Sequence, residues 1–257
     1  MDETATSAPA QGRGDDATEP TFATQSEAAY HRIREAIITG QLAPNEKLLL
    51  DGLRERFRFG TSPLREALSR LAADRLVIAR GQRGFRVAPI SEEEYRDIVN
   101  MRLLLEPEAL QRSIANATLA WEGNVAAAFH RLSRVESALD RAPDDSGGIW
   151  EHENQRFHFA LVENCGSPWL LNFITALADQ AERYRRPAVE MRAVPMERLI
   201  QEHKALFDAA MSRNATLAAE LLKVHIRNAA SHLSKALFHA GDDAAGGQAI
   251  EAGNEQA

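Results

Sequence analysis

The sequence predicts a mainly α-helical protein in two parts: a small N-terminal unit of three helices and a β-hairpin, and a larger C-terminal all-α bundle. Three observations predict this fold class. Apolar residues recur at helical spacing through most of the chain. Strand-like segments are confined to a glycine-containing stretch near residue 80, and 257 residues suffice for two units that each bury a core. We place the units at 25–90 and 91–239, between tails at 1–24 and 240–257 whose small and polar composition predicts disorder.

The N-terminal unit is predicted to begin with a helix that starts at Ser26, as N-cap, and ends at Gly40. A short amphipathic helix fits 50–57, where Leu and Phe recur on one side. A third helix follows, capped by Thr61 or Ser62 with a proline near its first position, where a missing N–H costs little.

Two short apolar runs, 76–78 and 85–87, flank a basic tip bounded by glycines. This pattern predicts a two-stranded hairpin. Three helices followed by such a hairpin make a winged helix-turn-helix, a fold that reads DNA.

The C-terminal unit is predicted to open with a helix capped by Ser91, with three glutamates in its first turn. Pro107 lies inside this helix and is expected to kink it. Breaks in the helical pattern divide the rest into about six helices, which favours a bundle; they fall at 116–122, 141–148, 166–168, 192–195 and near 214.

Charge is distributed unevenly along the chain. The net charge is −7, yet residues 26–89 carry twelve basic side chains against seven acidic ones, and both flanking segments are net negative. Such a basic segment is typical of a surface that neutralises phosphates, although arginines also form solvated faces.

Candidate DNA contacts lie where the second helix of a helix-turn-helix enters the major groove and where the wing tip reaches the neighbouring minor groove. An arginine at the start of this helix can pair with guanine or clamp a phosphate. The residues that we expect at DNA are Arg54, Thr61, Ser62, Arg65, Arg70, Gln82 and Arg83. The structural alternative is that Thr61 or Ser62 only caps its helix.

The segment TSPLREALSRLAADRLVIARGQRGFRVAP resembles the winged helix-turn-helix of GntR-type repressors, whose usual pattern is SRTPVREAL followed by a wing. The resemblance implies homodimers on operator half-sites, with Thr61, Ser62, Pro63 and Arg65 at the DNA together with the wing residues Arg83 and Gly84. The chain departs from the pattern at Thr61, where the family commonly has a base-contacting arginine, and carries Asp51 where relatives often have a basic residue.

Three histidines lie on the apolar faces of three different predicted helices: His158, His203 and His225. Asn154 lies one turn before His158 on the same face. Imidazoles with one amide oxygen suit a divalent transition metal such as Zn, Ni or Cu, with open positions left for an anionic ligand. The alternative is a set of core histidines that hydrogen-bond to protein groups.

The same residues resemble the helical ligand domain of the FadR branch, often called FCD, which has D-x3-H in one helix and a histidine in each of two later ones. The resemblance implies a metal held by Asn154, His158, His203 and His225, with Asn154 in place of the usual aspartate, and a small organic acid as effector. The segment MRLLLEPEAL is similar to the family's R-x3-E. Arg102 in this segment is expected either to bind the carboxylate effector or to pair with Glu106.

These features together predict a ligand-responsive, DNA-binding transcription regulator, with a double-stranded operator, a small carboxylate and a second copy of the chain as partners. A metal-dependent enzyme and a constitutive DNA binder are the alternatives. Against the enzyme, no HExxH motif occurs and Glu202 is expected to point away from the metal face. The arginines between 183 and 186 are expected to be solvated.

The chain has no apolar run long enough for a membrane span and no export signal, so we expect it in the cytoplasm. Cys165, the single cysteine, is expected to pack in the core.

Overall fold

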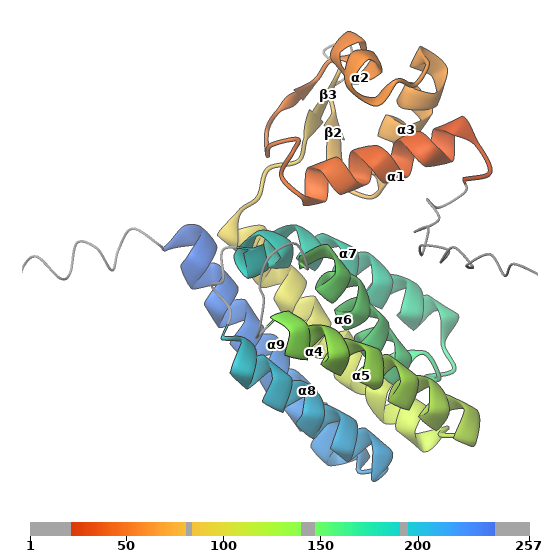
Figure 1. Cartoon of the computed structure of the whole chain (residues 1–257), viewed down its shortest axis with the longest axis vertical. Coiled ribbons are helices and arrows are strands. Elements are labelled where there is room, and N and C mark those ends of the chain that lie inside the picture. Colours follow the sequence, from red (N-terminus) through yellow and green to blue (C-terminus); the bar gives the residue numbers. More distant parts are fainter. Residues whose placement is uncertain (1–21, 81–83, 140–146, 191–194, 240–257) are drawn as a thin grey trace, which may run out of the picture.

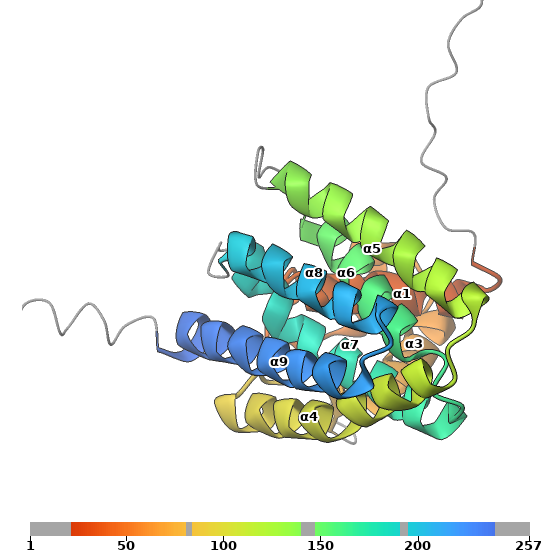
Figure 2. The ribbon, with the colours of Figure 1, turned by 90° about the horizontal axis from the view of Figure 1, so that it is seen from below.

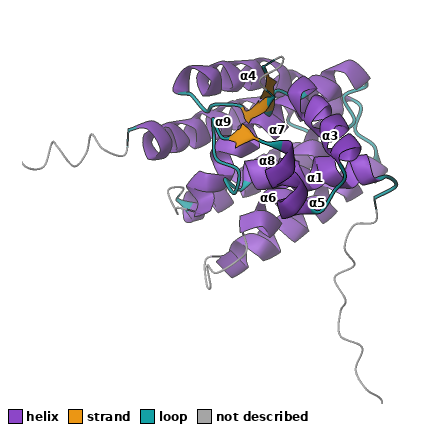
Figure 3. Ribbon diagram, turned by 90° about the horizontal axis from the view of Figure 1, so that it is seen from above, coloured by secondary structure: helices purple, strands orange, loops and turns teal. Residues whose placement is uncertain are grey.

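The computed structural model describes residues 22–80, 84–139, 147–190 and 195–239. Two groups of helices are stacked end to end, a small N-terminal one above a larger C-terminal one (Figure 1). Each has its own core of buried apolar side chains. The mainly α-helical fold class predicted from the sequence is confirmed, and the strands form one small patch in an otherwise helical molecule (Figure 3).

The N-terminal unit contains α1 (Gln25–Ile38), α2 (Leu50–Phe57) and α3 (Thr61–Ala73). Its strands are β1 (Lys47–Leu48), β2 (Val77–Ala79) and β3 (Phe85–Val87), which form an antiparallel sheet in the order β1-β3-β2. The sequence predicted only β2 and β3; β1 has two residues and carries too little alternation to be recognised.

Two predicted helix caps in this unit are wrong. Thr24, not Ser26, caps α1 by accepting a hydrogen bond from the N–H of Glu27, while the hydroxyl of Ser26 donates to Glu66. Gly60 is the N-cap of α3 and makes no side-chain cap bond. Thr61 and Ser62 are therefore the first helical residues, and their hydroxyls are exposed at the end of α3.

The C-terminal bundle contains six helices in the described residues: α4 (Glu92–Ala115), α5 (Leu119–Leu139), α6 (Gly147–Val162), α7 (Pro168–Glu190), α8 (Met196–Met211) and α9 (Ala215–Phe238). Ser91 caps α4 as predicted, and α4 continues through the buried Pro107. The helices pack in a closed ring, α4 on α9, α9 on α8, α8 on α5, α5 on α6, α6 on α7 and α7 on α4 (Figure 2). Side chains that point inward from different helices therefore meet in the centre. No described helix is both long and apolar enough to cross a membrane.

Helix α7 joins the bundle to the N-terminal unit through ion pairs with α1. Nη2 of Arg34 lies 2.8 Å from Oε2 of Glu182 and 3.2 Å from Oδ1 of Asp179. Arg186 pairs with Glu35 at 2.7 Å. We refer to these five residues as the α1–α7 clamp.

The arginines between 183 and 186 are not a solvated run, so that prediction is wrong. Arg183 is buried and donates to the carbonyls of Ala88 and Pro89 at 2.8 and 3.0 Å, which fixes the connection between the two units. Arg185 is almost buried and pairs with Glu151. The sequence misled because charged residues on consecutive positions of a helix point in different directions, and here most of them find partners.

Candidate functional site

The exposed end of α3 carries the first group of predicted DNA contacts. Thr61, Ser62 and Arg65 are all exposed. Within the described residues, Arg65 takes part in no ion pair, so its guanidinium is available to an external anion. The first N–H groups of α3 lack a side-chain cap, and such a helix end attracts phosphate.

The other predicted DNA contacts have different surroundings. Arg54 is exposed and lies 3.5 Å from Asp51, which offsets part of its charge. The guanidinium of Arg70 lies over the ring of Tyr30 at 4.4 Å, which holds it near α1. Gly84 has a φ of +80°, a conformation that favours glycine, and its carbonyl closes the wing by accepting from the N–H of Arg80. Gln82 and Arg83 lie outside the described residues.

The three histidines predicted as metal ligands meet in the centre of the bundle. His158 comes from α6, His203 from α8 and His225 from α9. Their ring centroids lie 4.8–5.4 Å apart, and one nitrogen of each lies within 4.8 Å of the others. Asn154, one turn before His158 on α6, is buried beside them and lines the same cavities.

Two carboxylates orient two of the imidazoles. Nδ1 of His203 lies 2.6 Å from Oε1 of Glu136, and Nδ1 of His225 lies 3.0 Å from Oε2 of Glu202. Metal-binding histidines are commonly held in this way, because a carboxylate on one ring nitrogen leaves the other nitrogen unprotonated and available to the ion. The expectation that Glu202 points away from the cluster is wrong, since α8 and α9 pack closely enough for its side chain to cross to His225.

The protonation states of the site fit metal binding. Burial is the main cause that lowers the pKa of His225 to about 4, with a contribution from nearby His203. The pKa of His158 is also lowered by burial. Burial alone would raise the pKa of Glu202, but hydrogen bonds from His225 and Asn228 lower it to about 2. At neutral pH the cluster therefore presents neutral imidazoles backed by an ionised carboxylate.

Unpartnered nitrogens give the most direct support for a bound ion. Nε2 of His203 and Nδ1 of His158 are buried and have no hydrogen-bond partner. Buried polar atoms without partners are rare, and a transition metal would satisfy both. Zinc takes nitrogen ligands at about 2.0–2.1 Å, so the rings would have to draw together slightly around it. The residues present therefore fit a divalent transition metal.

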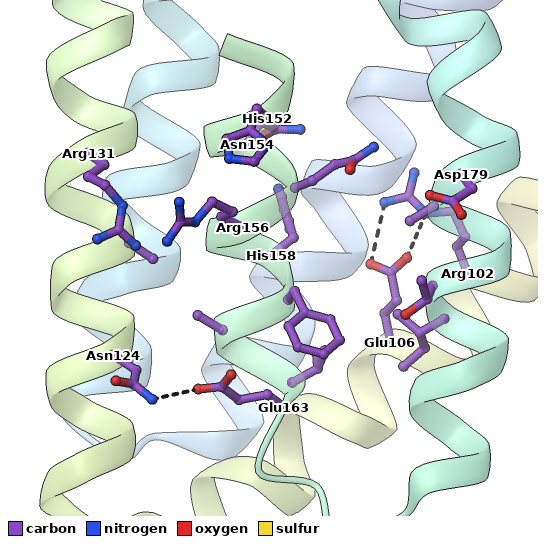
Figure 4. A pocket seen from close by; sticks show the side chains of 18 of the residues that line it. Arg102, Glu106, Asn124, Arg131, His152, Asn154, Arg156, His158, Glu163 and Asp179 are labelled. Atoms are coloured by element: carbon purple, nitrogen blue, oxygen red, sulfur yellow. Dashed lines mark hydrogen bonds and ion pairs between the residues drawn. The ribbon is translucent and has the colours of Figure 1, made fainter. Parts of the chain in front are cut away.

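A cavity of about 710 Å³ opens beside the histidines between α5, α6 and α7 (Figure 4). Its walls include His158, Asn154 and Arg102. Arg102 donates to Glu106 at 2.6 Å, and both side chains are buried. The two expectations for Arg102 are thus compatible, because it pairs with Glu106 and also lines a cavity large enough for a small molecule.

Sequence reasoning missed Glu136 and Arg185. Glu136 lies on the buried stripe of α5, one turn after Leu132, and a lone carboxylate in such a stripe is the signal that could have identified it. Arg185 lines the cavity from α7. Nothing in its local sequence distinguishes it from its arginine neighbours.

Family comparisons agree with this architecture. Residues 25–87 match the model described as bacterial regulatory proteins, gntR family, and residues 97–228 match the FCD domain. The chain is 39% identical over 205 residues to the uncharacterized HTH-type transcriptional regulator BphR of Paraburkholderia xenovorans (strain LB400), covering 80% of this chain and 83% of that protein. It is 37% identical over 202 residues to the HTH-type transcriptional repressor GlaR of Escherichia coli (strain K12), covering 77% and 90%.

Solved structures share the fold. McbR/YncC of E. coli superposes with a TM-score of 0.68 at 18% identity and covers 83% of this chain and 99% of its own. A GntR-type regulator from Rhodococcus sp. RHA1 gives a TM-score of 0.66 at 20% identity, over 81% and 97%. The winged helix-turn-helix at the N-terminus, the FCD bundle that follows it and relatives that are transcription regulators rather than enzymes lead to one conclusion: the chain belongs to the GntR family of HTH-type transcription regulators, in the branch with an FCD domain.

Proposed function

We propose that this regulator is a homodimeric, metal-containing repressor that a small organic acid releases from its operator. The observation that carries the proposal is the place of α7. This helix lines the cavity beside the histidines and also holds α1 and the connection between the two units. A ligand in the cavity therefore contacts the same helix that positions the DNA-binding unit.

On the DNA side, we assign the major-groove contacts to Thr61, Ser62 and Arg65 at the exposed end of α3. Their exposure and the unpaired guanidinium of Arg65 in the described ion-pair set support this role. Arg54 and Arg70 are assigned to the DNA backbone, because each already has a partner in the protein. The wing residues Gln82, Arg83 and Gly84 are assigned to the neighbouring minor groove.

On the effector side, we assign Asn154, His158, His203 and His225 to the metal, with Glu136 and Glu202 orienting two of the rings. A divalent ion there supplies a Lewis acid that binds carboxylate oxygen. Arg102 faces the same cavity and would contact the acid directly, since its pairing with Glu106 leaves further N–H donors.

We propose the α1–α7 clamp as the mechanical link between the two sites. Asp179 lines the cavity and pairs with Arg34 of α1. Glu182 accepts from Arg34 and also from Gln155, another residue of the cavity wall. A ligand that shifts α7 thus changes contacts that set the position of α1, which packs on the DNA-reading helix α3.

An exposed apolar face on α4 and α7 is our candidate for the dimer contact. Tyr95 at the start of α4 stacks on Tyr184 near the end of α7, so the two packed helices run in opposite directions. This brings the exposed Leu104 of α4 to about the level of the exposed Phe173 of α7. Exposed apolar patches of this kind mark interaction sites, and two-fold dimers suit operators with two half-sites.

The test is a binding titration of the metal-loaded protein on its own upstream intergenic DNA at fixed salt, with and without a panel of small carboxylic acids. Specific binding that one acid weakens is the expected result. Binding that no acid changes would favour a constitutive DNA binder, and binding that an acid strengthens would reverse the sign of the regulation. We place the protein in the cytoplasm, where such an operator is accessible.

A further inference from the structure

A second, enclosed space lies behind the main cavity. Its volume is about 30 Å³, and it is lined by His158, His225, Asn154, Arg102, Arg185 and Trp150, together with aliphatic side chains of α8 and α9. Four of these residues also line the main cavity: Arg102, Asn154, His158 and Arg185. A molecule held beside the histidines could therefore extend one group into the inner space.

Trp150 is the polar side chain of this space that has no partner. Its ring is 2% exposed, and its indole Nε1 has no hydrogen-bond partner. A buried tryptophan usually donates its N–H to an acceptor, and a buried donor without one costs on the order of 1–3 kcal/mol. The neighbouring buried indole of Trp121 follows the usual rule, because it donates to the carbonyl of Ala160 at 2.9 Å.

The charges around the inner space are already paired. Arg102 donates to Glu106 at 2.6 Å, and Arg185 binds both carboxylate oxygens of Glu151, one of them at 2.8 Å. A second anion would therefore enter without an unpaired cation to balance it. The volume is also too small for a carboxylate, since a space of this size holds a water or a group of one or two heavy atoms.

We propose that Trp150 determines effector specificity by donating a hydrogen bond to a single uncharged oxygen, a hydroxyl or a carbonyl, that the acid carries next to its carboxylate. The inference rests on the proposed function, because the carboxylate itself lies in the main cavity at the metal. A hydrogen-bonding pocket discriminates strongly against analogues that lack the matching group, since the donor is then left without a partner. The effector class is thus an oxygenated acid, such as a 2-hydroxy or 2-oxo acid, rather than a plain one.

The test compares butyrate, 2-hydroxybutyrate and 2-oxobutyrate on the zinc-loaded full-length protein by calorimetry. We expect at least one of the oxygenated acids to bind about tenfold more tightly than butyrate, as one hydrogen bond allows. In Trp150→Phe this preference is lost while metal content stays unchanged. Trp169→Phe is the matched control, because Trp169 is exposed on α7, and it should keep the preference.

A second measurement uses the native protein and does not depend on how the variant folds. The indole ¹⁵N–¹H resonance of Trp150, identified as the one absent in Trp150→Phe or by sequential assignment, should shift with the preferred acid and not with butyrate. A preference that survives in Trp150→Phe would mean that metal chelation alone selects the oxygen, and would overturn the inference. Equal binding of all three acids would overturn only the role of Trp150, whereas binding of none would contradict the carboxylate effector as well.

Discussion

Replacing Glu136 by Gln tests the metal site more sharply than removing a histidine, because it alters no ligand. Glu136 and His203 are fully buried, with 2.6 Å between Oε1 and Nδ1, and Oε2 of Glu136 has no partner. Glu136→Gln keeps the shape and removes the negative charge that makes the imidazole a stronger ligand. Loss of such a partner typically weakens metal binding 10- to 100-fold, or about 1.4–2.7 kcal/mol.

The stability of the metal-free protein should change in the other direction or not at all. A neutral amide is cheaper to bury than a carboxylate with one unpartnered oxygen, so the free energy of unfolding without metal should not fall. Zinc affinity is measured by competition with a chelator after EDTA dialysis, and stability by urea unfolding. Glu220→Gln, at an exposed glutamate of α9, is the control and should alter neither. Zinc affinity equal to that of the native protein would refute the role of Glu136.

Three further predictions follow from the DNA-reading helix, the buried imidazoles and the clamp. Arg65→Ala should weaken operator binding by about 1–3 kcal/mol at fixed salt, while Arg112→Ala, at an exposed pair in the bundle, should not; equal losses would point to nonspecific charge. Because the pKa of His225 is about 4 in the folded protein and about 6.5 when unfolded, the unfolded state binds more protons at pH 5. The metal-free protein should therefore lose about 2 kcal/mol of stability between pH 7 and pH 5 through this residue. The pH dependence of urea unfolding should be smaller in His225→Gln by that amount, and an identical dependence would contradict the assignment. Arg34→Gln leaves Glu182 buried without its cation, which should raise the pKa of that carboxyl further and cost about 2 kcal/mol of stability. The same variant should reduce the change in operator affinity that the acid causes, as measured by titration with and without it; an undiminished response would exclude the clamp as the link.

Much of the DNA-reading unit could be predicted from its sequence, because its signals are local. Helix α2 has the predicted bounds, and the strands of the hairpin are within one residue of the prediction. The errors are the caps of α1 and α3 and the missing strand β1. Several polar residues stand in a row at each of these helix starts, and which of them caps the helix depends on backbone angles that the residue types do not specify.

The candidate site was predicted in its ligands and not in its surroundings. An inward-facing histidine is evident from its place in an apolar stripe, so His158, His203 and His225 could be found helix by helix. Glu136 on α5 and Glu202 on α8 have their roles only because the ring of helices brings them to histidines 67 and 23 residues away in the chain. The arginines of α7 were misjudged for the same reason, since their partners belong to α1, α6 and the connection after β3.

The sequence by itself therefore determined which helices form, which face of each turns inward and that three imidazoles lie on such faces, because helical periodicity and burial act within one segment. Only the tertiary structure decided which carboxylate orients which histidine, that Arg102 both pairs with Glu106 and lines the cavity, and that α7 connects the cavity to the DNA-reading unit. Those features depend on distances between helices that are far apart in the chain, and these distances are set when the whole bundle packs.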